Sequence, residues 1–317
     1  MARYLVKRIA SAVLTMFFVT AIIYILLSLL QGTALDVMGG SGGEMSAADY
    51  EAARHALELD LPVWLRYVHW LRDVLRWDLG VSYRYGAPVG EVIAQRLGPS
   101  ALLWGTGLLF AVILGLPIGI TAAYRPGSIW DRLSSFFALS GFAVPRFISC
   151  IAFIYFFSFR LRLFPAMGMH SVGDASFGDL VRHLILPASL IGFGAMGYLI
   201  KQTRSACLET FQEDYLKTAR AKGLSEWEVV LKHGFRAALA PILTQTVLQI
   251  PEIVGGSAIT EKIFGWPGVG ALMIDAIRNR DTTLIMGVAL TIAALVLTAN
   301  ILLDIAYGLL DPRVTSR

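Results

Sequence analysis

IASAVLTMFFVTAIIYILLSLL, residues 9–30, is the stretch that decides the fold. It contains no charged residue, and a helix of about 20 such residues crosses the roughly 30 Å hydrocarbon layer of a bilayer. The basic residues Arg3, Lys7 and Arg8 precede it. A cleaved signal peptide has the same order, but its apolar core is only about 7–15 residues long. We therefore predict an uncleaved first membrane span.

Five further apolar blocks follow along the chain: Ala101–Tyr124, Leu133–Ser158, Leu184–Ile200, Pro241–Thr260 and Leu284–Leu303. The whole chain is 56% hydrophobic and 16% charged, whereas about 25% of the residues in soluble domains are charged. Within the second block, the pair Gly115-x-x-x-Gly119 would let two helices approach closely. The composition predicts an all-α integral membrane protein with six transmembrane helices.

Lysine and arginine in the short loops indicate the orientation, because cytosolic loops carry an excess of them. With the N-terminus inside, the cytosolic segments hold fourteen and the two short outer loops hold six. Both termini are therefore expected to be cytosolic. We divide the chain into an N-terminal span (1–30), an extracytoplasmic segment (31–99) and a five-helix core (100–317), which includes a cytosolic loop (203–240).

Several function classes find no support in the residues. The phosphate-binding pattern G-x-x-x-x-G-K-[ST] is absent, so we expect no phosphate-loop ATP site on this chain. The five histidines form no H-E-x-x-H motif and there is no G-x-S-x-G, so we expect no catalytic residue and no metal site. The net charge of +4 is spread over loops, which argues against a nucleic-acid partner. Cys150 and Cys207 lie in separate segments and are expected to be unpaired.

The extracytoplasmic segment begins with the glycine-rich stretch Gly39–Gly43. A short helix begun by Ser46 is expected next. Trp64, Tyr67 and Trp70 then follow at helical spacing, and such an aromatic face suits a helix lying on the outer membrane surface. Two interpretations stay open for this face, namely anchoring at the membrane interface and docking of an outer partner.

The predicted cytosolic loop has the clearest local pattern. Glu213–Lys222 has a helix-forming composition, and Gly223 stands where a left-handed residue ends a helix. Ser225 then begins a second helix, with Glu228 three positions later to complete a capping box. We therefore predict a helix, a glycine turn and another helix.

The first helix of this loop combines the small residues Ala219 and Ala221 with the basic residues Lys217, Arg220 and Lys222. Small residues permit close approach of another surface, and cations favour an acidic or polar groove. A short helix laid into a groove of a partner is a common binding mode. From spacing alone, a basic loop that enforces orientation or attracts anionic lipid explains the pattern equally well.

The segment DYLKTARAKGL, residues 214–224, resembles the cytosolic signature of ABC importer permeases of the oligopeptide, dipeptide and nickel branch. Other branches often begin this motif with Glu-Ala-Ala, where this chain has Lys217-Thr218-Ala219, and this departure is typical of the peptide branch. Further stretches are similar to the same family, in order along nearly the whole chain. They are Leu163–Gly168, Leu184–Ala188, Thr203–Ser205, Leu231–His233, Gly255–Ser257, Glu261–Gly270 and Leu310–Arg313.

The resemblance implies a multi-pass permease in the inner (plasma) membrane of a prokaryote that pairs with a second, homologous permease. Two cytosolic ATPase subunits, which bind ATP and Mg, would drive the pair, and an extracytoplasmic binding protein would deliver substrate. No cofactor is expected on this chain, and membrane lipid is its remaining partner. The branch carries oligopeptides, dipeptides, nickel, metal chelates and some glycosides, of which we expect oligopeptides or dipeptides. The residues that would couple to the ATPase are Asp214, Tyr215, Lys217, Thr218, Ala219, Arg220, Ala221, Lys222, Gly223 and Leu224.

A polar stripe in the fifth apolar block suggests where substrate passes. Its members fall on one helix face, at i, i+4, i+7 and i+11, and polar faces of membrane helices normally meet protein or water. Arg146 lies at about the same depth, roughly 16–20 Å from the cytosolic end of its span. We hypothesise that these residues line the path and that Arg146 contacts or flanks Glu252. The alternatives are a structural pair, or an arginine that satisfies carbonyls freed by the neighbouring proline. The stripe consists of Gln245, Gln249, Glu252 and Gly256.

The outer turn with Phe264, Trp266 and Pro267 is expected, by resemblance, near the gate or the dock of the binding protein. A rigid turn with Trp266 at the membrane interface explains it equally well. An ion-coupled secondary transporter is the rival function class. Such proteins commonly have two similar halves, and we find no repeat between residues 1–160 and 160–317.

Overall fold

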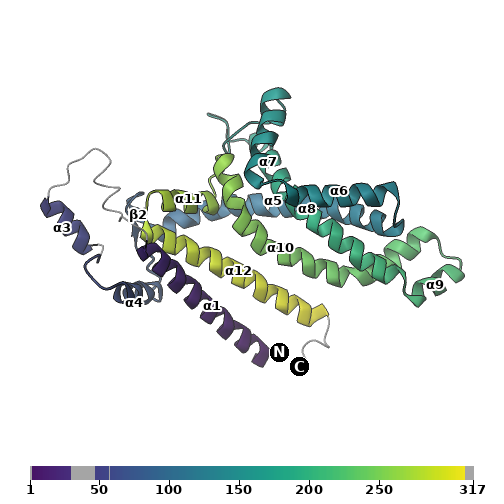
Figure 1. Ribbon diagram of the computed structural model, residues 1–317, viewed down its shortest axis with the longest axis horizontal. Helices are drawn as coiled ribbons and strands as arrows, with labels where there is room; N and C mark the ends of the chain where they lie inside the picture. Colours follow the sequence, from purple (N-terminus) through teal and green to yellow (C-terminus); the bar gives the residue numbers. More distant parts are fainter. Residues whose placement is uncertain (1, 30–46, 57, 311–317) are drawn as a thin grey trace. The chain divides into compact units, whose positions relative to one another are not determined.

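The computed structural model describes residues 2–29, 47–56 and 58–310, and these are mostly helical (Figure 1). Within them, four helices are long and apolar enough to cross a membrane, and they coincide with the first, second, fourth and sixth predicted spans. Gly39–Gly43 and Ser46 lie outside the described residues. The four helices are α1 (Ala2–Leu29), α5 (Val89–Tyr124), α8 (Phe177–Phe211) and α12 (Thr282–Leu310).

The third predicted span, Leu133–Ser158, is not one continuous helix. It is divided into α6 (Ile129–Ala143), α7 (Arg146–Phe153) and the π-helix η1 (Ile154–Arg160). The chain is extended at Val144, with φ −97° and ψ 126°. Pro145 explains the break, because its ring disfavours a helical conformation for the residue before it and it has no N–H to donate. Within the described residues, α6 and α7 make a fifth span only if this bent pair counts as one.

The fifth predicted span lies in α10, which is helical from Arg236 to Ile263. The four helices above are counted over described side chains only, and α10 includes residues 251–253, whose side chains are not described. The count of six spans therefore stays a prediction, as do the three predicted segments (1–30, 31–99 and 100–317) and the cytosolic location of both termini.

The chain forms two compact units, the first from residues 1–99 and 268–298 and the second from residues 100–267 and 299–317. In the first unit, β1 (Val81–Ser82) pairs antiparallel with β2 (Ala87–Pro88). The buried Asp281 ties this hairpin to the N-terminus of α12, because its carboxylate accepts hydrogen bonds from Ser82 Oγ at 2.6 Å and Leu284 N at 3.0 Å. The apolar core of this unit is formed by residues from the start of α5, from α11 (Val269–Arg278) and from α12.

Two helices of the predicted extracytoplasmic segment are described, α3 (Ala47–Ala56) and α4 (Val63–Val74). On α4 the predicted aromatic face is divided. Tyr67 stacks on Trp70 and packs against α1, where its hydroxyl lies 2.9 Å from Thr20 Oγ1. Trp64 is exposed. Anchoring and docking both remain predictions for this helix.

The core of the second unit is built on α8, which packs along α10 and α6 (Figure 1). Glycines set the closest approaches. A Cβ on Gly119 would lie 2.6 Å from Thr203 Cβ, and a Cβ on Gly197 would lie 2.5 Å from the carbonyl oxygen of Ala138. The close approach predicted for Gly115-x-x-x-Gly119 is thus confirmed, because α5 packs against α8 along this pair.

Candidate functional site

The loop between α8 and α10 carries the short helix α9, Asp214–Ala221. Gly223 ends it in the left-handed conformation, with φ +80°. Its N–H donates to the carbonyl of Arg220 at 2.9 Å, and the N–H of Leu224 donates to the carbonyl of Ala219 at 3.4 Å. This pair of bonds is a Schellman motif, which satisfies carbonyls that the end of a helix leaves free. The predicted helix and glycine stop are therefore confirmed.

The second helix of the loop begins after Ser225 and continues through the π-helix η2 (Glu228–Phe235) into α10. The predicted capping box is present. Ser225 Oγ donates to the Glu228 carboxylate at 2.9 Å and accepts from the Glu228 N–H at 3.3 Å, while the Ser225 N–H donates to the same carboxylate at 3.2 Å. The hydrogen bond from the Ser225 hydroxyl, above all, lowers the pKa of Glu228, so the cap holds a carboxylate at neutral pH.

One face of α9 is buried against the rest of the loop. Leu216 is 0% exposed and Ala219 is 9% exposed, and both pack with Val229, with Phe211 at the edge. Gly234 permits this packing, because a Cβ there would lie 2.6 Å from the ring of Phe211. An isolated helix as short as α9 is not stable in water, so this cluster holds it in place.

Ala219 was expected to allow close approach of a partner surface, but in the structure its side chain lies in this internal cluster. Helical geometry explains the difference, because positions three apart share a face and Leu216 points inward. Arg220 also acts within the loop, since its Nε lies 3.0 Å from Glu226 Oε1. Neither side chain is fully available to a partner here.

The opposite face of α9 is exposed. Its side chains are those of Asp214, Lys217, Thr218 and Ala221, with Lys222 beside them. Lys217 Nζ lies 2.7 Å from Asp214 Oδ1, and this hydrogen bond lowers the pKa of Asp214. Both partners are solvent-exposed, so water screens the pair and it contributes little to stability. This outer face is small, polar and held rigidly, as a surface that fits a groove would be.

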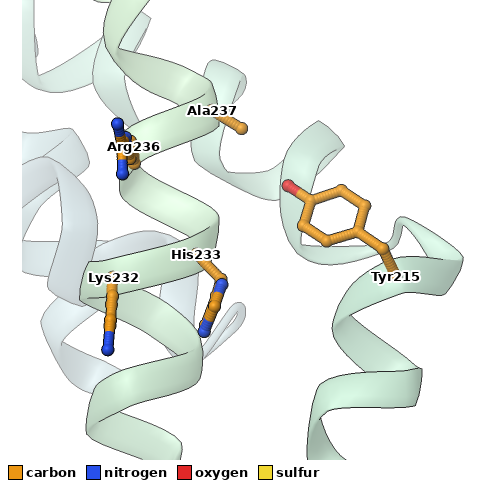
Figure 2. A pocket seen from close by; sticks show the side chains of 5 residues that line it. All are labelled: Tyr215, Lys232, His233, Arg236 and Ala237. Atoms are coloured by element: carbon orange, nitrogen blue, oxygen red, sulfur yellow. The ribbon is translucent and has the colours of Figure 1, made fainter.

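A hollow of about 420 Å³ opens on the flank of α9, between it and the start of α10. Figure 2 shows that Lys232, His233, Arg236 and Ala237 come from the continuous helix, while the Tyr215 hydroxyl points toward it from α9. Partial burial, followed by the charge of Glu213, raises the pKa of Tyr215. Its phenol is therefore a neutral hydrogen-bond donor at physiological pH.

The predicted path residues lie between helices of the second unit. Gln245 accepts a hydrogen bond from the Tyr198 hydroxyl at 2.6 Å, and Gln249 is buried. The guanidinium of Arg146 lies against Gly256, where a Cβ would come 2.5 Å from Nη1. The side chain of Glu252 is not among those described. The structure thus brings Arg146 to one member of the stripe, and a path-lining role stays a prediction.

Arg146 Nη1 is buried and finds no hydrogen-bond partner among the described residues. The predicted alternative, that this arginine satisfies carbonyls freed by Pro145, is not seen for this atom. A buried donor without a partner costs free energy, about 1–3 kcal/mol or more for a charged group.

The outer turn is buried. Phe264 and Trp266 are 2% and 1% exposed, in apolar clusters of the second unit. Gly168 N donates to the carbonyl of Phe264 at 2.8 Å, and Gly265 adopts φ +61°. Trp266 is therefore not an exposed interfacial residue in this structure, and neither aromatic ring offers a surface to an outer partner. A gating role for this turn stays a prediction.

Sequence reasoning missed two acidic residues that organise the second unit. Asp131 is buried and forms a two-pronged ion pair with Arg204, in which Arg204 Nη2 lies 2.9 Å from Asp131 Oδ2. Glu261 is 0% exposed and accepts hydrogen bonds from Ser100 Oγ at 2.9 Å and Ser257 Oγ at 3.2 Å. Asp131 and Arg204 are 73 positions apart, and Glu261 and Ser100 are 161 positions apart, so no local pattern connects these pairs.

Within the described residues, no group of three or more histidine, cysteine, aspartate or glutamate side chains could hold a metal ion. Cys150 and Cys207 are buried free thiols.

Comparison with known proteins identifies the family. Residues 115–316 match the family model described as binding-protein-dependent transport system inner membrane component, and residues 1–102 match the model of its N-terminal region. A Brucella suis protein named as a peptide permease is 39% identical, over 99% of both chains. The dipeptide transport system permease protein DppB of Escherichia coli K12 is 32% identical, again over 99% of both chains.

The oligopeptide transport system permease protein AppB of Bacillus subtilis is 34% identical over 99% of both chains. Among solved structures, an inward-facing form of the MetNI methionine ABC transporter has a chain that superposes with a TM-score of 0.55. That match covers 71% of this chain and 97% of the other, at 17% identity, and it supports the fold. The chain therefore belongs to the family of inner membrane components of binding-protein-dependent transport systems and is a multi-pass permease subunit of an importer.

Proposed function

We propose that this permease subunit imports dipeptides or oligopeptides and receives mechanical work from a separate ATPase subunit through the outer face of α9. The relatives named above as peptide, dipeptide and oligopeptide permeases, at 32–39% identity, support the substrate class. The observation that carries the coupling role is that α9, although only eight residues long, is ended by a Schellman motif, held by a buried cluster and followed by a second helix with its own capping box. A merely basic loop would not need three such devices.

The remaining assembly follows from this proposal. The chain forms half of a channel with a second, homologous permease, two ATPase subunits supply ATP hydrolysis, and a binding protein delivers the peptide outside. Six spans with both termini in the cytosol place α9 on the side of the ATPase. Coupling rests on the exposed members of the signature, among them Thr218, Ala221 and Lys222, while Leu216 and Ala219 hold the helix in place.

Site-specific crosslinking tests the coupling role. Ala221→Cys places a thiol on the exposed face of α9, and Cys150 and Cys207 are buried, so the new thiol is the reactive one. In the assembled importer we expect it to crosslink to the ATPase subunit. A matched control, Val172→Cys, lies on a fully exposed turn that the proposed topology assigns to the opposite side of the membrane. Crosslinking of Val172→Cys but not of Ala221→Cys would refute the assignment.

Arg146 is the residue that we propose for contact with the peptide in the path. Its Nη1 is buried and has no hydrogen-bond partner among the described residues, so we propose it as a charged donor to a carboxylate, and every linear peptide carries a carboxylate at its C-terminus. Gly194 and Gly256 leave the space in which the guanidinium lies. Uptake of a dipeptide and of its C-terminal amide distinguishes this role: Arg146→Gln should reduce uptake of the free acid more than uptake of the amide, and equal reduction of both contradicts it.

A further inference from the structure

The hollow beside Tyr215 has no part in the contacts that hold α9, yet it gathers positive charge. Lys232 and Arg236 are exposed on the same helix, four positions apart, and His233 lies between them. Within the described part of the chain, no carboxylate lies within ion-pair distance of any of the three. Glu228 acts on Lys232 and His233 only at longer range, and its carboxylate is engaged with Ser225.

The donors in this hollow match a phosphate group. Tyr215 offers a neutral O–H across the hollow from the basic helix (Figure 2). Lysine binds phosphate as a point charge, and arginine can bind it through two N–H groups at once. A phosphate diester has no positive charge that would conflict with this lining.

The position of the hollow along the chain indicates where the phosphate comes from. The lining helix becomes apolar at Ala237 and continues without interruption into α10. Arg236 precedes Pro241, the first residue of the apolar block, by about 7–8 Å along the helix axis. The headgroup layer on each side of a bilayer is about 5–8 Å thick, so the basic side chains lie at the depth of headgroup phosphates.

The hollow is also distinct from the surface proposed for the ATPase. Tyr215 lies on the flank of α9, between the buried face with Leu216 and the outer face with Thr218. An ATPase groove that receives the outer face would leave this flank free toward the bilayer. We infer that the hollow binds the phosphate of an anionic phospholipid, such as phosphatidylglycerol, on the cytosolic leaflet. This inference rests on the topology of the proposed function.

Lipid retention tests the inference. The complete importer is reconstituted in vesicles of phosphatidylcholine and phosphatidylglycerol, extracted, and analysed by native mass spectrometry for bound lipid. Each basic residue near an anionic surface contributes about fivefold to binding, so the double variant Lys232→Gln, Arg236→Gln should retain about 30-fold less phosphatidylglycerol. The charge-conserving pair Lys232→Arg, Arg236→Lys should restore most of it, which separates lost binding from misfolding.

A control variant removes two cations elsewhere. Arg125→Gln with Arg132→Gln lowers the charge equally, at an exposed residue before α6 and one in its first turn, neither of which lines the hollow, and should reduce retention much less than the double variant at the hollow. Equal loss in both double variants would overturn the inference, because it would show attraction by net charge alone. Displacement of the lipid by inorganic phosphate at physiological concentration would also overturn it, in favour of a soluble ligand. A crosslink from the hollow to the ATPase would show that a protein fills it instead. None of these measurements depends on peptide uptake. The lipid site and the proposed import of peptides can therefore be refuted separately.

Discussion

Replacing Leu216 with alanine removes the largest side chain that α9 buries in the loop. Leu216 is 0% exposed and packs with Ala219, Val229 and Phe211. Buried Leu→Ala substitutions cost about 2–5 kcal/mol, and the small size of this cluster favours the lower part of that range. The two ion pairs on α9 are exposed, so solvent screens them and they cannot compensate for this loss.

The expected result is local unfolding of α9. A helix of this length does not persist without tertiary contacts. A loss of about 2–3 kcal/mol raises the open population about 30- to 150-fold, and the spans, whose cores do not include Leu216, keep their structure. Amide hydrogen exchange of the assembled importer in lipid measures this directly, as lost protection across residues 215–224. Peptide-stimulated ATP hydrolysis and uptake should fall together.

Lys217→Ala is the matched control for stability. Its side chain is 66% exposed, so the substitution should change exchange in α9 by no more than about twofold. Unchanged protection in Leu216→Ala would refute the packing argument. Lost protection with full coupled uptake would refute the functional argument, because a melted α9 could not transmit work.

Three further predictions concern other sites. Lys222→Glu reverses an exposed charge without breaking a contact within the chain. It should weaken binding of the ATPase subunit about tenfold, measured by pull-down. Unaltered binding would exclude this residue from the interface. Gly256→Ala should displace the Arg146 guanidinium, because the new Cβ would lie 2.5 Å from Arg146 Nη1. Peptide uptake should fall while the importer still assembles. Full uptake by both Gly256→Ala and Arg146→Ala would end the path-lining hypothesis. Asp131→Asn weakens the ion pair with Arg204 and should lower the free energy of unfolding by about 1–3 kcal/mol. The measurement is the apparent melting temperature, which should fall. An unchanged melting temperature would show that the pair does not stabilise the protein.

The sequence was sufficient wherever the determinants are local. The helix of α9, the left-handed Gly223 and the Ser225–Glu228 capping box all depend on neighbours within a few residues, and all three were predicted correctly. The apolar run of residues 9–30 likewise indicates a membrane helix by itself.

Predictions failed where a second element decides the outcome. Ala219 reads as a small contact residue in the sequence, but its orientation depends on Val229. For Trp266 the sequence left a gate or dock and the membrane interface equally open, and neither interpretation anticipated the apolar cluster that buries the ring. The break at Pro145 is a different case, because the proline signal was present and the apolar composition around it concealed the interruption.

The central claim is that this chain conducts solute and is driven by a partner through α9. Uptake of a labelled dipeptide into proteoliposomes, with ATP inside and an uncoupler present, tests it most directly, in the complete importer and in the same preparation without ATPase subunits. The account predicts accumulation only with the ATPase subunits, undiminished by the uncoupler. Uphill accumulation by this chain without them, abolished by the uncoupler, would contradict it and would indicate an ion-coupled transporter.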